Sequence, residues 1–144
     1  ERLLPLATII TPNLPEAMCL LGREEDVTEE EFPEVARELW KLLGRRNAWV
    51  YLKGGHLEGE SAYDLLFNNV VSVPFTAPRV PTKNTHGTGC TLSSAVAAFL
   101  AQGLPLDEAV ACAKEYINAA IIAGAAYEIG HGHGPVHHFF NFWE

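Results

Sequence analysis

Continuous apolar runs alternate with amphipathic stretches along the chain and predict strands followed by helices. Residues 6–10 and 48–52 are short apolar runs rich in β-branched or aromatic side chains, which is typical of buried strands. Pro12-Asn13 ends the first run, and Lys53-Gly54-Gly55 follows the second. Because strands that are apolar on both faces suit a sheet covered on both sides, the two runs favour a parallel sheet between layers of helices.

Two amphipathic stretches in the first third of the chain predict capped helices. Asn13 is placed to cap a helix over residues 14–21. Thr28 and Glu31 have the spacing of a capping box at the start of a second helix. An apolar stripe continues that helix until Gly44 closes it.

The rest of the chain predicts a hairpin and two further helices. Residues 62–67 and 70–75 flank Asn68-Asn69, which indicates a hairpin with a two-residue turn. Small-residue and apolar patterns predict helices over 89–101 and 106–123. The resulting order of strands and helices is typical of an α/β layered architecture.

Composition narrows the classes of function. The chain has 144 residues and a formal net charge of −8, which argues against a nucleic-acid partner. Its apolar runs are shorter than the roughly 20 residues of a membrane span, so we expect no membrane segment. It does not begin with Met, which suggests a processed or incomplete chain. Three cysteines without CxxC spacing indicate a reduced, cytoplasmic compartment.

A glycine-rich turn leads into the helix predicted from residue 89. Gly87, Thr88 and Gly89 precede Cys90, and the free amides and dipole of a helix start form an anion site. In a phosphoryl-transfer enzyme such a site would stabilise charge on the moving phosphoryl group. Spacing alone leaves an ordinary glycine turn equally open. Cys90 would be either a proton acceptor for a substrate hydroxyl or a small buried apolar side chain.

Three polar residues follow the predicted strands at their carboxyl ends, where ligands bind in open α/β sheets. Lys53 would neutralise a phosphate as a point charge, or it would be a solvated lysine. Asn13 and Glu16 have N-cap and N3 spacing, and spacing favours reciprocal capping. The alternative is that this pair orients water around Mg²⁺-ATP, and both roles are compatible.

The tail from residue 130 onward is rich in glycine, histidine and aromatic side chains. Its histidines lack strict ligand spacing, so a zinc site is the weaker interpretation and we expect no direct protein ligand for a metal. We expect the tail to dock on the body of the protein. The histidines are His131, His133, His137 and His138.

Five segments together resemble the hydroxymethylpyrimidine/phosphomethylpyrimidine kinase family, and they occur in the family's order. The string Thr-His-Gly-Thr-Gly-Cys-Thr at residues 85–91 is the most specific. Ribokinase-like sugar kinases mostly carry Asp at the position of Cys90. A cysteine at this position therefore resembles the vitamin-kinase branch that includes the pyrimidine kinases. The segments are residues 11–17, 52–57, 76–80, 82–93 and 130–139.

The resemblance implies a three-layer α/β/α sandwich of the ribokinase-like fold, with ATP across the carboxyl ends of the strands. The amides from Gly87 to Cys90 would form an anion hole, and Cys90 stands at the position of the family's catalytic base. Lys53 would contact the ATP phosphates. Asn13 and Glu16 would organise Mg²⁺ and the phosphates.

The resemblance also implies a function. The family phosphorylates 4-amino-5-hydroxymethyl-2-methylpyrimidine with ATP, and then its monophosphate, in thiamine biosynthesis. Residues 1–144 resemble the C-terminal half of that single kinase domain, without the N-terminal substrate-binding half, so the isolated chain would be a poor catalyst or none. A homodimer is implied as well. The alternatives are a pyridoxal/pyridoxine kinase and a non-catalytic nucleotide-binding or assembly module.

Overall fold

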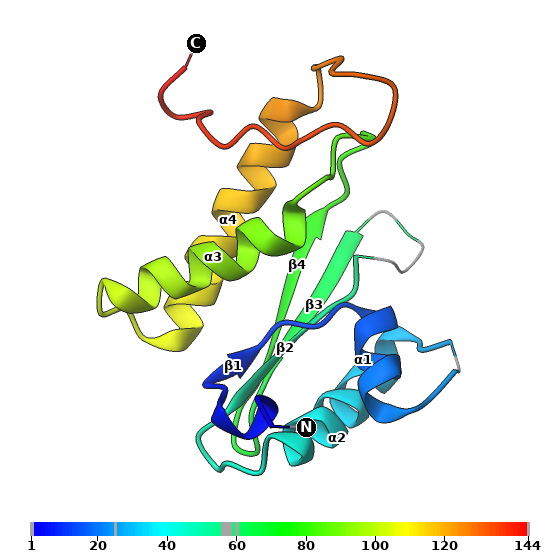
Figure 1. The fold of residues 1–144 in the computed structure, drawn as a ribbon, viewed down its shortest axis with the longest axis vertical. Coiled ribbons are helices and arrows are strands. Elements are labelled where there is room, and N and C mark those ends of the chain that lie inside the picture. Colours follow the sequence, from blue (N-terminus) through cyan, green and yellow to red (C-terminus); the bar gives the residue numbers. More distant parts are fainter. Residues whose placement is uncertain (1, 25, 56–58, 60, 144) are drawn as a thin grey trace. The chain divides into compact units, whose positions relative to one another are not determined.

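The computed structural model describes residues 2–24, 26–55, 59 and 61–143, which divide into two compact units, Glu1–Arg79 and Val80–Glu144 (Figure 1). The predicted order of strands and helices is confirmed. The strands are β1 (Ile9–Ile10), β2 (Trp49–Lys53), β3 (Ser61–Phe67) and β4 (Ser72–Pro78). The helices are α1 (Leu14–Leu21), α2 (Phe32–Leu43), α3 (Thr88–Ala101) and α4 (Leu106–Gly124), with 3₁₀ turns η1 (Leu4–Leu6) and η2 (Glu29–Glu31).

The first unit contains a mixed sheet with the order β1-β2-β3-β4. The predicted parallel pairing holds for β1 and β2, where Ile9 lies opposite Trp49. The pairs β2–β3 and β3–β4 are antiparallel. The parallel pair places the carboxyl ends of β1 and β2 at the same edge of the sheet, so the segments that follow them start side by side.

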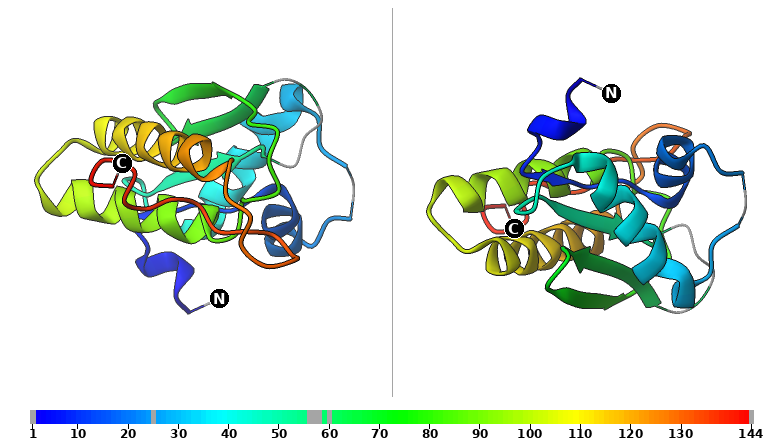
Figure 2. Two further views of the ribbon diagram at one scale, coloured as in Figure 1. Left: turned by 90° about the horizontal axis from the view of Figure 1, so that it is seen from above. Right: turned by 90° about the horizontal axis from the view of Figure 1, so that it is seen from below.

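Helices α1 and α2 cover one face of this sheet (Figure 2). Alternate residues of β2 and β3 point into the layer between helices and sheet, where Leu52 and Leu65 lie in the same cluster as Phe32 and Leu39 of α2. Phe32, Leu39 and Leu52 have no exposed surface. Burying a side chain of this size contributes about 2 kcal/mol, so this layer fixes the strand ends that position the site.

Both predicted capping boxes are confirmed. Asn13 Oδ1 accepts from the Glu16 amide at 2.8 Å, and Glu16 Oε2 accepts from the Asn13 amide at 2.8 Å. Glu31 Oε2 accepts from the amide of Thr28 at 2.8 Å and from its hydroxyl at 2.9 Å. These two hydrogen bonds to the charged form, the backbone one first, hold the pKa of Glu31 below its usual value.

Two sequence expectations about strands were wrong in detail. Leu6 belongs to η1 and is 72% exposed, because Pro5 favours a helical turn there and the strand begins only at Ile9. The hairpin between β3 and β4 is closed by residues 68–71 rather than by two residues. Its longer turn is stabilised by Asn68 Oδ1, which accepts from the amides of Val70 at 2.8 Å and Val71 at 2.7 Å.

The second unit is a pair of helices, α3 and α4, held by small and branched side chains. Ala109, Ala113 and Ala120 of α4 have no exposed surface, and Leu92 and Val96 of α3 are buried. Small side chains allow a close approach of helix backbones. Among the described residues, no helix is long and apolar enough to cross a membrane.

The tail of the second unit docks as expected, and it does so mainly through its backbone. The His137 amide donates to Ala120 O at 3.0 Å, and the Tyr116 hydroxyl donates to His138 O at 2.9 Å. The ring of His137 lies between those of Tyr127 and Trp143, with centroid distances of 5.3 and 5.8 Å. The tail therefore returns to the C-terminal part of α4, which it crosses in Figure 1.

Candidate functional site

The first unit brings Asn13, Glu16 and Lys53 to the same edge of the sheet. The Lys53 amide donates to Pro12 O at 2.9 Å, and Asn13 pairs with Lys53 as an isolated parallel bridge. This pairing extends the β1–β2 register beyond the end of β1. Lys53 therefore lies beside the amino terminus of α1, whose cap is Asn13 and whose third residue is Glu16.

The capping box leaves polar atoms of this group available. It uses Asn13 Oδ1 and Glu16 Oε2, while the side chain of Glu16 is exposed. Within the part of the chain that the structure describes, no group of three or more His, Cys, Asp and Glu side chains could hold a metal ion. Mg²⁺ usually keeps several water ligands and binds one or two carboxylates together with substrate phosphates. The residues present fit Mg²⁺ held through water and substrate phosphates, with Glu16 Oε1 available to accept from a water ligand of the metal.

A buried carboxylate that the sequence analysis missed lies behind Lys53. Asp64 of β3 stands opposite Lys53 in the register and is 4% exposed. Its Oδ2 accepts from the Tyr51 hydroxyl at 2.8 Å, and its Oδ1 accepts from the Gly54 amide at 2.9 Å. Burial first, and then the neighbouring Asp64 charge, raise the pKa of Tyr51 well above its usual value, so the phenol remains a donor.

The turn after Lys53 is held from its other side by Arg79. Arg79 Nη1 donates to Gly55 O at 2.7 Å, and Nη2 lies 3.4 Å from Gly54 O. Gly54 is required here because a Cβ at this position would meet the backbone oxygen of Tyr63 and would come within 2.9 Å of Phe32 Cζ. His56 and Leu57, which complete the resemblance segment 52–57, lie outside the described residues.

The second unit brings Gly87, Thr88, Gly89 and Cys90 together at the start of α3. Gly87 is the N-cap with φ 84°, a left-handed conformation that favours glycine. The Thr91 amide donates to Gly87 O at 2.9 Å, which closes the first turn. The Thr88 hydroxyl donates to Thr85 O at 2.7 Å, and its amide lies 3.3 Å from the same oxygen.

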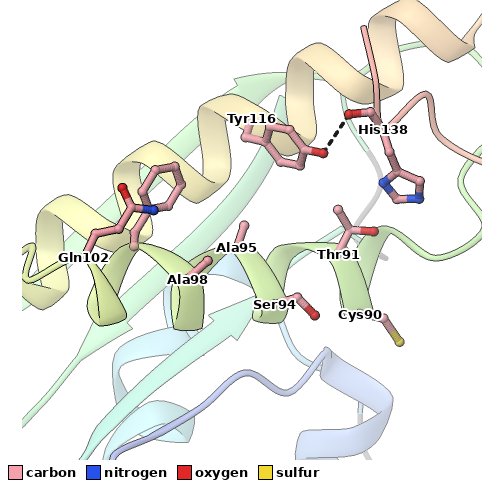
Figure 3. A pocket seen from close by; sticks show the side chains of 9 residues that line it. Cys90, Thr91, Ser94, Ala95, Ala98, Gln102, Tyr116 and His138 are labelled. Carbon is pink, nitrogen blue, oxygen red and sulfur yellow. Dashed lines mark hydrogen bonds between the residues drawn. The ribbon is translucent and has the colours of Figure 1, made fainter. Parts of the chain in front are cut away.

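The amides of Gly89 and Cys90 are left at the amino terminus of α3 without a recorded acceptor among the described residues. The first amides of any α-helix lack an intrahelical partner, and the helix dipole adds partial positive charge there. Cys90 is exposed, and Figure 3 shows its thiol on the side of α3 turned away from α4. This end of α3 can therefore receive an anion, with the thiol beside it.

A mainly apolar groove begins at Cys90 and runs along α3 (Figure 3). Its volume is about 520 Å³. Thr91 and His138 lie at the end nearest the anion turn, and Gln102 lies at the other end. The groove adds a surface for an apolar group next to the amides of Gly89 and Cys90.

The predicted site residues thus form two groups. Asn13, Glu16 and Lys53 are neighbours in the first unit, and residues 87–90 are neighbours in the second. The sequence analysis missed Asp64 as an anchor of the first group, and it gave no role to Asn84, which is 1% exposed in the second unit. An acidic residue directly before the apolar run Leu65-Leu66-Phe67 of a predicted strand was the one signal for Asp64.

Comparisons with known proteins agree with the sequence resemblance. A family model described as phosphomethylpyrimidine kinase matches residues 1–137. A hydroxymethylpyrimidine/phosphomethylpyrimidine kinase of Rhizobium meliloti is 49% identical over 144 residues, covering 100% of this chain and 53% of the relative. The thiamine biosynthesis bifunctional protein ThiED of Geobacter sulfurreducens is 53% identical over 138 residues, covering 96% of this chain and 27% of that protein. The chain spans about half the length of the Rhizobium relative.

A solved structure shares the fold. An ADP complex of Bacillus subtilis pyridoxal kinase superposes with a TM-score of 0.87 at 39% sequence identity, covering 98% of this chain and 51% of that one. The expected α/β fold is therefore confirmed, and it is shared with about half of a pyridoxal kinase whose solved structure is an ADP complex.

Proposed function

The chain belongs to the phosphomethylpyrimidine kinase family, and we propose that it provides the ATP-phosphate half of a kinase domain. That kinase phosphorylates 4-amino-5-hydroxymethyl-2-methylpyrimidine and then its monophosphate, a reaction of thiamine biosynthesis. The observation that carries the proposal is the pair of amides at Gly89 and Cys90, presented by the left-handed cap Gly87 in a chain of this family. A relative named as this kinase and another named for thiamine biosynthesis support it.

Each candidate residue has a role in this proposal. The Gly89 and Cys90 amides hold the phosphoryl group and stabilise the negative charge that builds on it during transfer. The Cys90 sulfur lies beside the attacking hydroxyl and, in its thiolate form, accepts the proton that the hydroxyl loses. The Lys53 ammonium neutralises ATP phosphates. Asn13 and Glu16 orient water around the nucleotide, and bound Mg²⁺ supplies charge neutralisation of the phosphates.

The proposal extends to the rest of the protein. Residues 1–144 form the C-terminal half of one kinase domain, in line with the share of the Rhizobium relative that they match. The pyrimidine pocket then lies mostly in the other half. The family resemblance implies a homodimer, which light scattering tests. The three cysteines are free thiols, and we propose a cytoplasmic location on that basis.

The first experiment measures Mg-ATP binding to the 144-residue chain by calorimetry. Lys53→Ala should weaken binding by about tenfold, because a hydrogen bond to a charged group contributes roughly 1.5–3 kcal/mol. Lys41→Ala is the matched control, because Lys41 is an exposed lysine on α2. Equal effects of the two substitutions, or no binding by the unaltered chain, would refute the phosphate role.

A second experiment separates a half-kinase from a non-catalytic nucleotide-binding module. The chain is mixed with the part of the Rhizobium relative that it does not match, and phosphorylation of the hydroxymethylpyrimidine is followed. Turnover by the mixture and not by either part supports the half-kinase. ATP binding without turnover by the mixture favours the non-catalytic module, and turnover by the chain alone contradicts the division into halves.

Pyridoxal is a second candidate substrate. The observation in its favour is the superposition on Bacillus subtilis pyridoxal kinase at 39% identity. The same complemented assay with pyridoxal in place of the pyrimidine tests it. A kcat/KM for pyridoxal above that for the hydroxymethylpyrimidine would assign the chain to this alternative.

A further inference from the structure

Asn84 is the buried amide of the second unit, and both of its side-chain donors are used at long range in the sequence. It is 1% exposed. Its Nδ2 donates to Gly124 O at 2.7 Å and to Tyr127 O at 2.7 Å, which are 40 and 43 residues away. These carbonyls belong to the last residue of α4 and to the turn after it. Asn84 therefore joins the segment before α3 to the end of α4.

The orientation of this amide follows from its partners. Two carbonyl oxygens can face only the NH₂ group, because turning the amide over would set its own oxygen against them. The Asn84 Oδ1 atom then faces the backbone of Gly134 and is buried without a hydrogen-bond partner. A Cβ on residue 134 would collide with that oxygen. Asn84 and Gly134 therefore fit each other closely.

The backbone around Asn84 is held on the same side by the tail. The His86 amide donates to Gly134 O at 3.0 Å, and His86 pairs with Pro135 as a parallel bridge. His133 Nδ1 lies 3.2 Å from Lys83 O. The segment 83–86 is thus clamped between the end of α4 and the tail, and Gly87 follows it directly.

We propose that Asn84 is a positioning residue for the anion turn. It anchors the segment that enters α3, and so it sets where the Gly89 and Cys90 amides stand when a phosphate arrives. The inference rests on the proposed function, since it assigns Asn84 a task for the same phosphate site. It also gives the His-Gly tail a task, which is to complete the clamp with the backbone of Gly134.

The physical basis is the cost of leaving buried polar groups without partners. Without the Asn84 amide, the part-buried Tyr127 O would lose its recorded donor, and the buried Gly124 O would keep only the Tyr127 amide at 3.1 Å. The segment 83–86 would then keep only its contacts to the tail. Its conformations would multiply, and the amides at the start of α3 would be preorganised for an anion in only a fraction of the molecules.

The test measures two quantities on Asn84→Ala and on the isosteric Asn84→Asp. Both substitutions remove the donors, and the second keeps the volume of the side chain. Hydrogen exchange of peptides covering residues 83–91, measured without nucleotide, should accelerate by about tenfold, while peptides of α2 in the first unit keep their rates. The affinity for Mg-ATP should fall by about tenfold.

Tyr116→Phe is the matched control. It also removes one hydrogen bond between the body and the tail, from Tyr116 Oη to His138 O, but it leaves the clamp at residues 83–86 intact. We expect it to leave the exchange of residues 83–91 unchanged.

Three results would overturn the proposal: unchanged exchange at residues 83–91 in both variants, acceleration that extends equally to α2, or local acceleration with unchanged Mg-ATP affinity. The second result would show a purely structural role. Failure of the unaltered chain to bind Mg-ATP is a different outcome, because it counts against the proposed function while the exchange data still report on the anchor.

Discussion

The two segments that carry the candidate phosphate-binding groups are anchored in different ways. Lys53 ends a strand, and the turn after it is held by Asp64, its direct neighbour on the adjacent strand. Gly87 begins a helix, and the segment before it is held by Asn84, whose partners lie 40 and 43 residues away. Asp64 and Asn84 are the charged or amide side chains recorded as buried among the described residues.

The difference shows how each segment depends on the rest of its unit. The Asp64 anchor forms with the hairpin itself, uses a carboxylate, and lies within a sheet whose other face carries the main apolar core. The Asn84 anchor is neutral and exists only after the end of α4 and the tail have returned to the segment before α3. We therefore expect loss of Asp64 to lower stability strongly, and loss of Asn84 to act locally.

The largest effect is expected from Asp64→Ala. The substitution leaves the Tyr51 hydroxyl and the Gly54 amide without their acceptor, and each buried unsatisfied group costs about 1–3 kcal/mol. The free energy of unfolding should fall by roughly 3 kcal/mol, measured by urea denaturation. Asp26→Ala, at an exposed position, is the control and should change it little. A loss at Asp64 no larger than the control would remove the distinction between the two anchors.

The next effect compares the same backbone strain in the two units, introduced by alanine at a glycine with positive φ in each. Gly87 has φ 84° and Gly44 has φ 64°, and an added Cβ would meet open space at both positions. Alanine in the left-handed region costs about 1–2 kcal/mol, so both substitutions should lower stability by a similar amount. Only Gly87→Ala should weaken Mg-ATP binding, because only Gly87 caps α3. If the two variants bound Mg-ATP equally well, the anion site would not lie at the start of α3.

Features that depend on neighbours along the chain could be predicted from the sequence. Both capping boxes, the left-handed glycine after α2 and the turn into α3 follow from residues within four positions of one another. The strands β1 and β2 were found from their apolar runs, although η1 took the start of the first run. The candidate site residues were found for the same reason, since each stands where a strand ends or a helix begins.

Features that depend on contacts between distant segments could not be predicted in this way. Asp64 lies in a strand whose pattern shows burial but not which hydroxyl and amide it will meet. Asn84 lies in the resemblance segment 82–93, yet its partners are backbone carbonyls, which no side-chain pattern encodes. The hairpin turn was mispredicted because Asn68 binds two amides of the loop and so favours a longer turn than Asn68-Asn69 alone.

A smaller effect tests the Asp64 anchor through pH. The unfolded chain loses the Tyr51 proton near the usual phenol pKa of 10.0, whereas the folded chain keeps it because its pKa is raised. Stability from this group is therefore complete below pH 10 and declines as the pH rises above it, by up to about 1.4 kcal/mol per unit. Tyr51→Phe should cost about 1 kcal/mol at pH 7 and abolish this share of the alkaline decline. Tyr127→Phe, with an exposed ring, should leave the decline unchanged. If the unfolding free energy fell with pH at the same slope in both variants, the decline would not come from the buried Tyr51–Asp64 pair.

The smallest effect is expected at the Thr28–Glu31 capping box. It involves neither Asp64 nor Asn84 and so serves as a reference for both anchors. Thr28 holds the pKa of Glu31 below its usual 4.5, so the stability from this capping box is present above pH 4.5 and is lost as the pH falls through the lowered value. Glu31→Gln keeps an acceptor for the Thr28 amide but cannot titrate. The difference in unfolding free energy between this variant and the unaltered chain should therefore depend on pH only in the acid range. Mg-ATP affinity at neutral pH should be the same in both, because the box caps η2 and contacts neither phosphate segment. A change in that affinity would mean that the first unit transmits surface changes to Lys53, and the Asp64 anchor would then be less rigid than the buried network indicates.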